Sequence, residues 1–180
     1  KIMLDKFLVI GSNSFSGSSM VRFLLEKGHD VIGCSRSKEP NDVLLPYKWL
    51  KKEKLKFEFY QVNLNHDLEK FGKIIYNKKP NYIINFSALG MVAQSWDKPE
   101  DWYQTSVVAQ VALHELLRKY DFIKKYVHVT TPEVYGSTNG WKKESFNFNP
   151  STPYAVSRAA CDMHLKSFFE AYDFPVVFAR

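Results

Sequence analysis

Apolar residues along the chain fall into two recurring patterns, short runs and helical stripes. Residues 6–11, KFLVIG, form a short apolar run of the kind found in a buried strand. Residues 67–77 instead place Leu68, Phe71 and Ile75 on one face of a helix. Along the whole chain, these patterns predict strands at 6–11, 30–35, 55–64, 81–88, 124–131 and 174–180, and helices at 17–28, 67–77, 100–120 and 153–172.

The alternation of strands with helices predicts the fold class. It is typical of an α/β fold with a doubly wound parallel sheet that helices cover on both faces. Ligands of such sheets bind at the carboxyl ends of the strands. Residues 36–54 are polar, contain two prolines and predict no clear element.

Length and composition are consistent with one domain over residues 1–180. A chain of 180 residues with 45% hydrophobic positions can bury a sizeable core. The sequence ends directly on a predicted strand, without the polar tail common at domain ends. We therefore expect the chain to be the N-terminal part of a longer protein.

Charge and cysteine content exclude several kinds of partner. The net charge of +6 comes from scattered lysine pairs rather than one basic stripe, so we expect no nucleic-acid partner, although the charge suits an anionic nucleotide. No apolar run is long enough for a membrane span and no signal peptide is evident, which predicts a cytoplasmic protein without a membrane partner. Cys34 and Cys161 lack metal-ligand spacing, and we expect no metal and buried packing roles for both.

A glycine-containing turn follows the first predicted strand. The segment GSNSFSG, residues 11–17, opens the first helix, where backbone N–H groups and the helix N-terminus can hold a pyrophosphate. Ser14 stands where a third glycine is common, and its hydroxyl could donate to a phosphate. The alternative is a plain strand-to-helix turn with Ser16 or Ser18 as N-cap. The candidate cofactor-binding residues of this turn are Gly11, Asn13, Ser14, Phe15, Ser16 and Gly17.

The end of the second predicted strand bears on the cofactor. Dinucleotide folds usually carry an acidic residue there for the adenosine ribose, but this chain has Ser35 followed by Arg36. A guanidinium can bind a 2′-phosphate through paired hydrogen bonds, which favours NADP over NAD. Binding of NAD beside a solvated arginine is the alternative.

Four motifs together resemble a known family. GSNSFSG, INFSALGMV, VTTPEVYGS and PYAVSRAACD, in this order, resemble the extended short-chain dehydrogenase/reductases, and specifically their nucleotide-sugar epimerases and dehydratases. The resemblance covers essentially the whole chain. It implies a Rossmann-type dinucleotide-binding domain, a C-terminal substrate domain that is absent here, and a homodimer formed through the two long helices. It also implies cofactor contacts from Asn63, Leu64, Ser87 and Ala88.

The resemblance assigns the catalytic roles. It implies that Thr131 and Tyr154 assist hydride transfer at the sugar C4, and that Arg158 stands where the family has lysine and contacts the nicotinamide ribose. Tyrosine suits the role of base because a nearby cation lowers the pKa of a phenol from about 10. Residues four apart share a helix face, so both side chains can point at one ribose. Arginine keeps the charge but is longer and planar, so its competence at this site is open.

The residues after Thr131 indicate the reaction. In dehydratases of the group a glutamate at the position of Glu133 removes the C5 proton, while Pro132 replaces the neighbouring acid. The resemblance thus favours a 4,6-dehydratase acting on a nucleotide sugar. An epimerase, a uronic-acid decarboxylase and a non-catalytic dinucleotide-binding protein are the alternatives.

Overall fold

The computed structural model describes residues 5–51 and 55–180, which form one six-stranded parallel sheet. The strands are ordered β3-β2-β1-β4-β5-β6, and their bounds are β1 Lys6–Ile10, β2 Asp30–Ser35, β3 Phe57–Gln61, β4 Tyr82–Asn85, β5 Lys125–Val129 and β6 Val176–Ala179. The predicted α/β doubly wound sheet is confirmed, with each strand inside its predicted range. The chain reverses direction across the sheet between β1 and β4, which is where such folds bind ligands.

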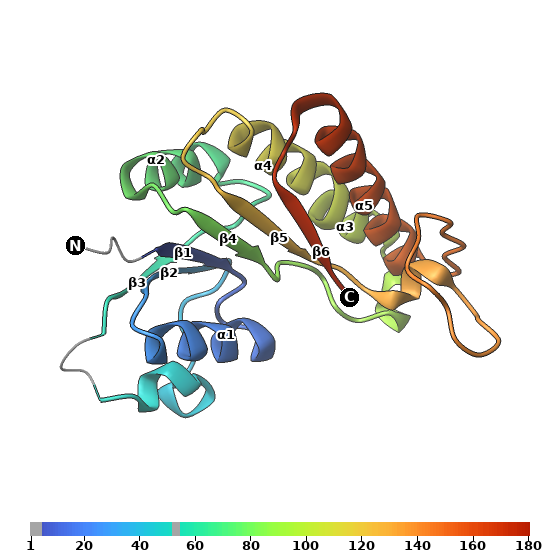
Figure 1. The fold of residues 1–180 in the computed structure, drawn as a ribbon. Coiled ribbons are helices and arrows are strands. Elements are labelled where there is room, and N and C mark those ends of the chain that lie inside the picture. Colours follow the sequence, from blue (N-terminus) through green and yellow to red (C-terminus); the bar gives the residue numbers. More distant parts are fainter. Residues whose placement is uncertain (1–4, 52–54) are drawn as a thin grey trace.

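Helices lie on both sides of the sheet (Figure 1). Helix α1, Phe15–Glu26, lies on one side and packs with the 3-10 turn η2, Pro46–Trp49. A second short turn, η1, covers Asp42–Leu44 in the segment that the sequence left without a clear element. Helices α2, Leu68–Lys78, and α5, Pro153–Tyr172, lie on the other side. The bounds of α5 match the prediction because Thr152 caps the helix and Pro153 occupies its first turn.

The predicted helix over 100–120 is continuous but not uniform. It begins as α3, Pro99–Tyr103, passes through a π-helical turn, Gln104–Val108, and continues as α4, Ala109–Leu117. A π turn inserts one residue into the helical repeat and often lies at a functional site. Around this turn, Thr105 contacts Asn65 after β3, and Gln110 contacts Asn85 and Ser87 at the carboxyl end of β4.

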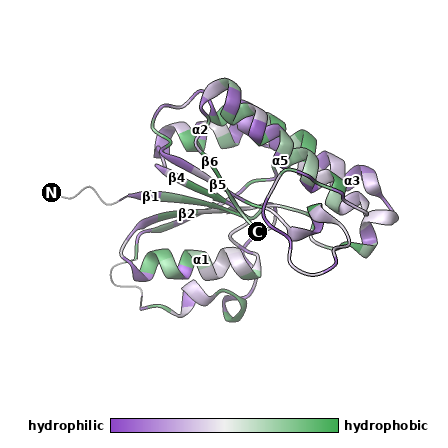
Figure 2. Ribbon diagram, turned by 45° about the vertical axis from the view of Figure 1, so that its right-hand side comes forward, coloured by the Kyte–Doolittle hydropathy of each residue, from purple (hydrophilic) through white to green (hydrophobic). Residues whose placement is uncertain are grey.

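Helices cover both faces of the sheet, as predicted, but they cover one face more fully than the other. The connections after β3, β4 and β5 all pass over the side that carries α2, α4 and α5. Among the described residues, the opposite side holds only α1 and short turns, and Val177 of β6 remains 43% exposed. Figure 2 shows green, apolar stretches in the strands and, interspersed with purple ones, in the helices on both sides of the sheet.

Two apolar cores fill these layers. The larger one packs strand residues such as Ile83 and Tyr126 against Phe71, Leu113 and Leu165 of the helices. The smaller one joins α1 to the other side of the sheet. Both cysteines are buried as predicted. Among the described residues, no helix is both long and apolar enough to cross a membrane.

Candidate functional site

The turn after β1 brings the start of α1 close to the end of the strand. Gly11 has a φ of 84°, a conformation that favours glycine. Ser14 is the N-cap of α1: its hydroxyl accepts a hydrogen bond from Gly17 N at 3.0 Å and donates one to Gly11 O at 2.7 Å. The cap is therefore Ser14 and not Ser16 or Ser18. Its hydroxyl already donates within the turn, which differs from the expected role as a phosphate donor.

The same turn fits an anionic group. The N–H groups of Phe15 and Ser16 form no hydrogen bond within the described residues, and they stand at the positive end of the α1 dipole. A Cβ on Gly17 would lie 2.2 Å from Gly11 O, so only glycine lets the helix start this close to the strand. A pyrophosphate of a dinucleotide suits this geometry.

A cavity of about 260 Å³ opens beside the turn, at the carboxyl ends of β1, β2 and β4. The predicted cofactor residues that line it are Gly11, Asn13, Ser14, Ser35, Arg36, Asn63, Leu64, Ser87 and Ala88. The predicted residues outside the lining are Phe15, Ser16, Gly17, Tyr154 and Arg158. Phe15 points to solvent with 91% of its surface exposed. The cavity thus brings together the predicted phosphate turn, the end of β2 and the segment after β4.

Arg36 lies at one end of this cavity. Ser35 is buried and its hydroxyl accepts a hydrogen bond from Asn13 N at 2.9 Å, which ties the end of β2 to the phosphate turn. The Asn13 side-chain amide donates to the carbonyl oxygens of Ser37 and Lys38. These contacts hold the loop in place while Arg36 itself is exposed and lines the cavity. A guanidinium in this position can contact an anionic group of a bound nucleotide.

Sequence reasoning missed several lining residues. Phe86 and Leu89 lie in the FSALG segment beside the predicted Ser87 and Ala88, so the motif itself was a usable signal. Thr105 reaches the cavity from the π turn, and its hydroxyl accepts a hydrogen bond from Asn65 Nδ2 at 3.2 Å. No motif pointed to Thr105, because its position depends on the π turn. The remaining missed residues are Ile10, Ser37, Val62 and Asn65.

Two predicted catalytic residues follow β5. Thr131 is buried and caps the 3-10 turn η6, Pro132–Tyr135, by accepting a hydrogen bond from Glu133 N at 3.3 Å. Glu133 is exposed and lines an open cavity of about 780 Å³ together with Trp141, Lys142 and Arg180. With Glu144, which also lines it, this second cavity offers two carboxylates, an indole and two cations to a ligand.

Tyr154 lies in the first turn of α5. Its N–H donates to the buried Ser95 Oγ at 3.1 Å and its carbonyl oxygen accepts from Ser157 Oγ at 2.8 Å, so its backbone position is well fixed. Val134, Tyr135 and Ala159 pack η6 against α5. The structure thereby brings the Thr131–Glu133 segment to the N-terminal half of α5. Within the described residues, the Tyr154 hydroxyl forms no hydrogen bond with Thr131 or Arg158.

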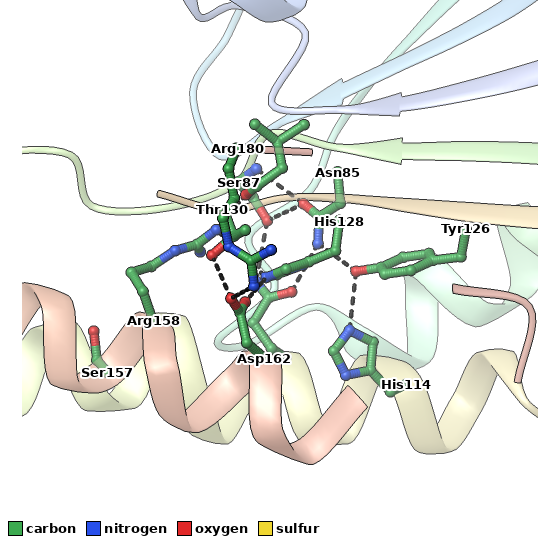
Figure 3. Close-up of polar contacts among 12 residues, drawn as sticks. Asn85, Ser87, His114, Tyr126, His128, Thr130, Ser157, Arg158, Asp162 and Arg180 are labelled. Atoms are coloured by element: carbon green, nitrogen blue, oxygen red, sulfur yellow. Dashed lines mark hydrogen bonds and ion pairs between the residues drawn. The ribbon is translucent and has the colours of Figure 1, made fainter. Parts of the chain in front are cut away.

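Contrary to expectation, the Arg158 side chain does not point toward the cofactor cavity beside Tyr154 but into the protein core. It is only 2% exposed, and its guanidinium donates to the carbonyl oxygen of Val129 at the end of β5 (Figure 3). The same Nη2 lies 3.4 Å from His128 Nε2. The longer side chain of arginine reaches under the strand, whereas a lysine ammonium is a compact donor at the end of a flexible stem.

A buried charged network surrounds Arg158. Asp162 has no exposed surface, and its carboxylate accepts hydrogen bonds from Thr130 Oγ1 at 2.9 Å and Arg180 Nη2 at 3.1 Å. His128 Nε2 lies 3.4 Å from the other oxygen of Asp162. Two arginines and one carboxylate thus share the space between β5, α5 and the end of β6.

A chain of polar side chains links the cofactor cavity to this core. Ser87 Oγ donates to Asn85 Oδ1 at 2.5 Å, and Asn85 Nδ2 donates to both Gln110 Oε1 and Tyr126 Oη at 2.7 Å. Tyr126 Oη lies 2.9 Å from His114 Nε2. Buried polar groups are costly unless paired, so this chain fixes the side chains that stand behind the cavity.

Burial controls the ionisation of these groups. Desolvation lowers the pKa of His114 well below its ordinary value, with a smaller contribution from His128 and His164. Desolvation also lowers the pKa of His128, although the Asp162 carboxylate opposes the shift. The pKa of the Cys161 thiol rises to about 12 for the same reason. Both imidazoles and the thiol are therefore neutral at pH 7.

Sequence relatives of the chain include proteins named as nucleotide-sugar dehydratases. The profile of the family described as GDP-mannose 4,6 dehydratase matches residues 8–180. A protein of Sinorhizobium fredii (strain NBRC 101917 / NGR234) named "Probable dTDP-glucose 4,6-dehydratase" is 29% identical over 193 residues, which cover 97% of this chain and 52% of that protein. GDP-mannose 4,6 dehydratase 1 of Arabidopsis thaliana is 29% identical over 92% of this chain and 48% of its own length. The chain spans about half the length of these curated relatives.

Solved structures with the same fold include epimerases and dehydratases. UDP-N-acetylglucosamine 4-epimerase from Methanobrevibacter ruminantium M1 superposes with a TM-score of 0.83 at 29% identity, over 99% of this chain and 55% of that one. The dTDP-glucose 4,6-dehydratase from Bacillus anthracis str. Ames, solved in complex with NAD, gives 0.79 at 26% identity over 97% of this chain and 53% of that one. With the phosphate turn, the sheet order and the profile match in agreement, the chain belongs to the GDP-mannose 4,6 dehydratase family, among the extended short-chain dehydrogenase/reductases that include nucleotide-sugar dehydratases and epimerases.

Proposed function

We propose that this chain is the dinucleotide-binding part of a nucleotide-sugar 4,6-dehydratase. The observation that carries the proposal is the position of Glu133, two residues after the buried Thr131 and beside a large open cavity at the carboxyl end of the sheet. The curated relatives above are named as 4,6-dehydratases, which supports the same reaction.

Each of three side chains has a chemical role in this proposal. Tyr154 takes the proton of the sugar C4 hydroxyl, and Thr131 holds the same oxygen by a hydrogen bond. A bound nicotinamide dinucleotide would supply the hydride acceptor for this oxidation and the hydride donor for the later reduction. Glu133 removes the C5 proton, which the 4-keto group acidifies, and loss of the C6 hydroxyl as water completes the elimination. Since Pro132 has no ionisable group, Glu133 or a water supplies the proton for that step.

The proposed cofactor is a nicotinamide dinucleotide, with NADP favoured by Arg36. The dehydratase from Bacillus anthracis was solved with NAD, which supports binding of the unphosphorylated form in the family. Arg36 lines the adenosine end of the cavity here, and Ser35 replaces the usual acidic residue. A 2′-phosphate would meet a cation and no carboxylate at this point.

A non-catalytic dinucleotide-binding protein is the second candidate. The burial of Arg158 favours it, because the guanidinium is engaged by Val129 and His128 rather than directed at the cofactor cavity. Epimerase and uronic-acid decarboxylase reactions share the first oxidation and remain alternatives within the enzyme class.

A mass assay on the protein that contains this chain separates these functions. The protein is incubated with NAD or NADP and a panel of nucleotide hexoses and uronic acids, and products are identified by mass spectrometry. A dehydratase yields a product lighter by one water, a decarboxylase one lighter by carbon dioxide, and an epimerase an isomer. Tyr154→Phe should lower turnover by about 100-fold or more, while Tyr103→Phe, a change on the exposed surface of α3, should not. Absence of turnover in wild type and in Arg158→Lys, with dinucleotide binding retained, would instead support the non-catalytic candidate.

The proposed assembly is a homodimer through the long helices. Val108 and Met163 are 54% and 57% exposed on the helical layer that includes the π turn and α5. Pairing with a second copy would bury these apolar side chains. Light scattering after gel filtration tests this, and the double change Val108→Asp and Met163→Asp should yield a monomer.

A further inference from the structure

Three potential metal ligands meet in the core behind the candidate site. His114 of α4, His128 of β5 and Cys161 of α5 each offer one donor atom, and the three atoms lie within 4.8 Å of one another. Their exposed fractions are 0%, 1% and 0%. Nothing in the proposed reaction uses these side chains, and they show no ligand spacing along the chain because they come from three separate elements.

The polar contacts of the two imidazoles involve Nε2 of each ring, which for His128 also lies 3.4 Å from Arg158 Nη2, and they leave Nδ1 available. His114 Nε2 is 2.9 Å from Tyr126 Oη, and His128 Nε2 is 3.4 Å from an oxygen of Asp162 (Figure 3). The Nδ1 atoms of both rings are buried and have no hydrogen-bond partner within the described residues. Histidines that bind metals typically have the other ring nitrogen held by a hydroxyl, carboxylate or carbonyl group in this way.

The donor set indicates the class of ion. Two imidazoles and a thiolate are ligands for borderline and soft metals, whereas magnesium and calcium require oxygen donors. We propose that His114, His128 and Cys161 form a buried three-ligand site for a d¹⁰ metal ion, Zn²⁺ or Cu⁺. Binding releases the Cys161 thiol proton to solvent. A Cu⁺–thiolate unit therefore adds no net charge to the core, and a Zn²⁺–thiolate unit adds one positive charge.

To bind one ion, the three donor atoms need to move only slightly closer together. Bonds of about 2.0 to 2.3 Å to one ion place its donors at most about 4 Å apart, so the most separated pair must approach by about 1 Å. Side-chain rotation of Cys161 and His114 can supply this movement without displacing the strand that carries His128. Since all three donors are buried, the ion enters while the chain folds.

Metal content after expression tests the site. The chain is produced in media supplemented with Zn²⁺, Co²⁺ or copper and purified under reducing conditions, and metal per chain is measured by mass spectrometry. We expect about one ion per wild-type chain, and a thiolate-to-cobalt charge-transfer band in the cobalt-grown protein. The zinc and copper media identify which ion is preferred.

Matched cysteine variants supply the control. Cys161→Ser should lose the cobalt band and most of the bound metal, whereas Cys34→Ser, at the other buried cysteine, should retain both. If Cys161→Ser does not fold, Tyr126→Phe keeps all three ligands but removes the hydroxyl at His114 Nε2, and it should weaken metal retention by about 10- to 100-fold. Folded wild-type protein without metal from all three media, or metal content unaffected by Cys161→Ser or Tyr126→Phe, would overturn the site.

Discussion

A methyl group on Gly17 would lie 2.2 Å from the carbonyl oxygen of Gly11. The contact is with backbone and cannot be relieved by rotating a side chain, so Gly17→Ala must move α1 away from β1. We expect the free energy of unfolding to fall by about 1 to 3 kcal/mol, with a clear loss of dinucleotide affinity. Denaturant titration and calorimetric binding measure the two effects.

Gly90→Ala is the control for this change. An added Cβ at Gly90 meets no atom within 4 Å, so both stability and affinity should stay near wild type. Unchanged dinucleotide affinity in Gly17→Ala would show that the turn does not hold the pyrophosphate.

The buried carboxylate of Asp162 should be important for stability. Asp162→Asn removes the charge that pairs with Arg180 while keeping the size of the side chain. Leaving the largely buried Arg180 guanidinium without its counter-charge should lower the free energy of unfolding by about 3 kcal/mol. Glu170→Gln, in an exposed pair with Lys166 on the same helix, should change it far less. Similar effects of the two variants in denaturant titrations would contradict the importance of the buried network.

Stability should depend on pH through the buried histidines. Burial lowers the pKa of His114 and His128 in the folded state below the ordinary value of about 6.5. Below that pH the unfolded chain binds protons that the folded chain does not, so stability is full above pH 6.5 and falls as the pH decreases, by about 1.4 kcal/mol per pH unit for each histidine. Unfolding titrations between pH 7.5 and 5, with a metal chelator present, measure this slope.

Between pH 7.5 and 5, the change in stability reports the histidines and not the paired carboxylates. Glu58, Glu69 and Glu115 have pKa values lowered from 4.5 by their cationic partners, so their contribution is lost only at lower pH. His114→Leu should reduce the slope, whereas replacement of the exposed His66 by glutamine should not. A flat profile in wild type would contradict neutral, buried imidazoles.

Arg36 should discriminate between the two dinucleotides. If its guanidinium binds a 2′-phosphate, Arg36→Ala should weaken NADP binding by about 10- to 100-fold and leave NAD binding nearly unchanged. Calorimetry with both cofactors measures the ratio. Arg22→Ala, which removes an exposed arginine paired with Glu26, controls for net charge. Equal affinities for NAD and NADP in wild type would contradict the proposed preference.

Local patterns predicted the sheet and the phosphate turn because both depend on nearby residues. The strands follow from short apolar runs, and the bounds of α5 from Thr152 and Pro153. The glycine spacing located the turn, although the role of Ser14 as the cap depended on backbone geometry.

Long-range contacts could not be predicted in this way. The spacing of Tyr154 and Arg158 indicated a shared helix face, but the direction of the guanidinium depends on the Val129 carbonyl, far away in sequence. The meeting of His114, His128 and Cys161 likewise depends on how α4, β5 and α5 pack.

The π turn between α3 and α4 has a consequence for chain length. Positions five apart on an α-helix lie about 140° apart around its axis. Thr105 and Gln110 are five apart, yet Thr105 contacts Asn65 at the cavity and Gln110 Nε2 donates to Ser87 Oγ at 3.1 Å. The π turn thus adds one residue between Thr105 and Gln110 and still keeps both side chains on the same side of the helix. A regular helix would do this with a spacing of four residues. Removing a single residue between them would give a regular helix with a four-residue spacing. Such a deletion can therefore preserve the contacts of both side chains, whereas a substitution at Thr105 or Gln110 would remove one of them.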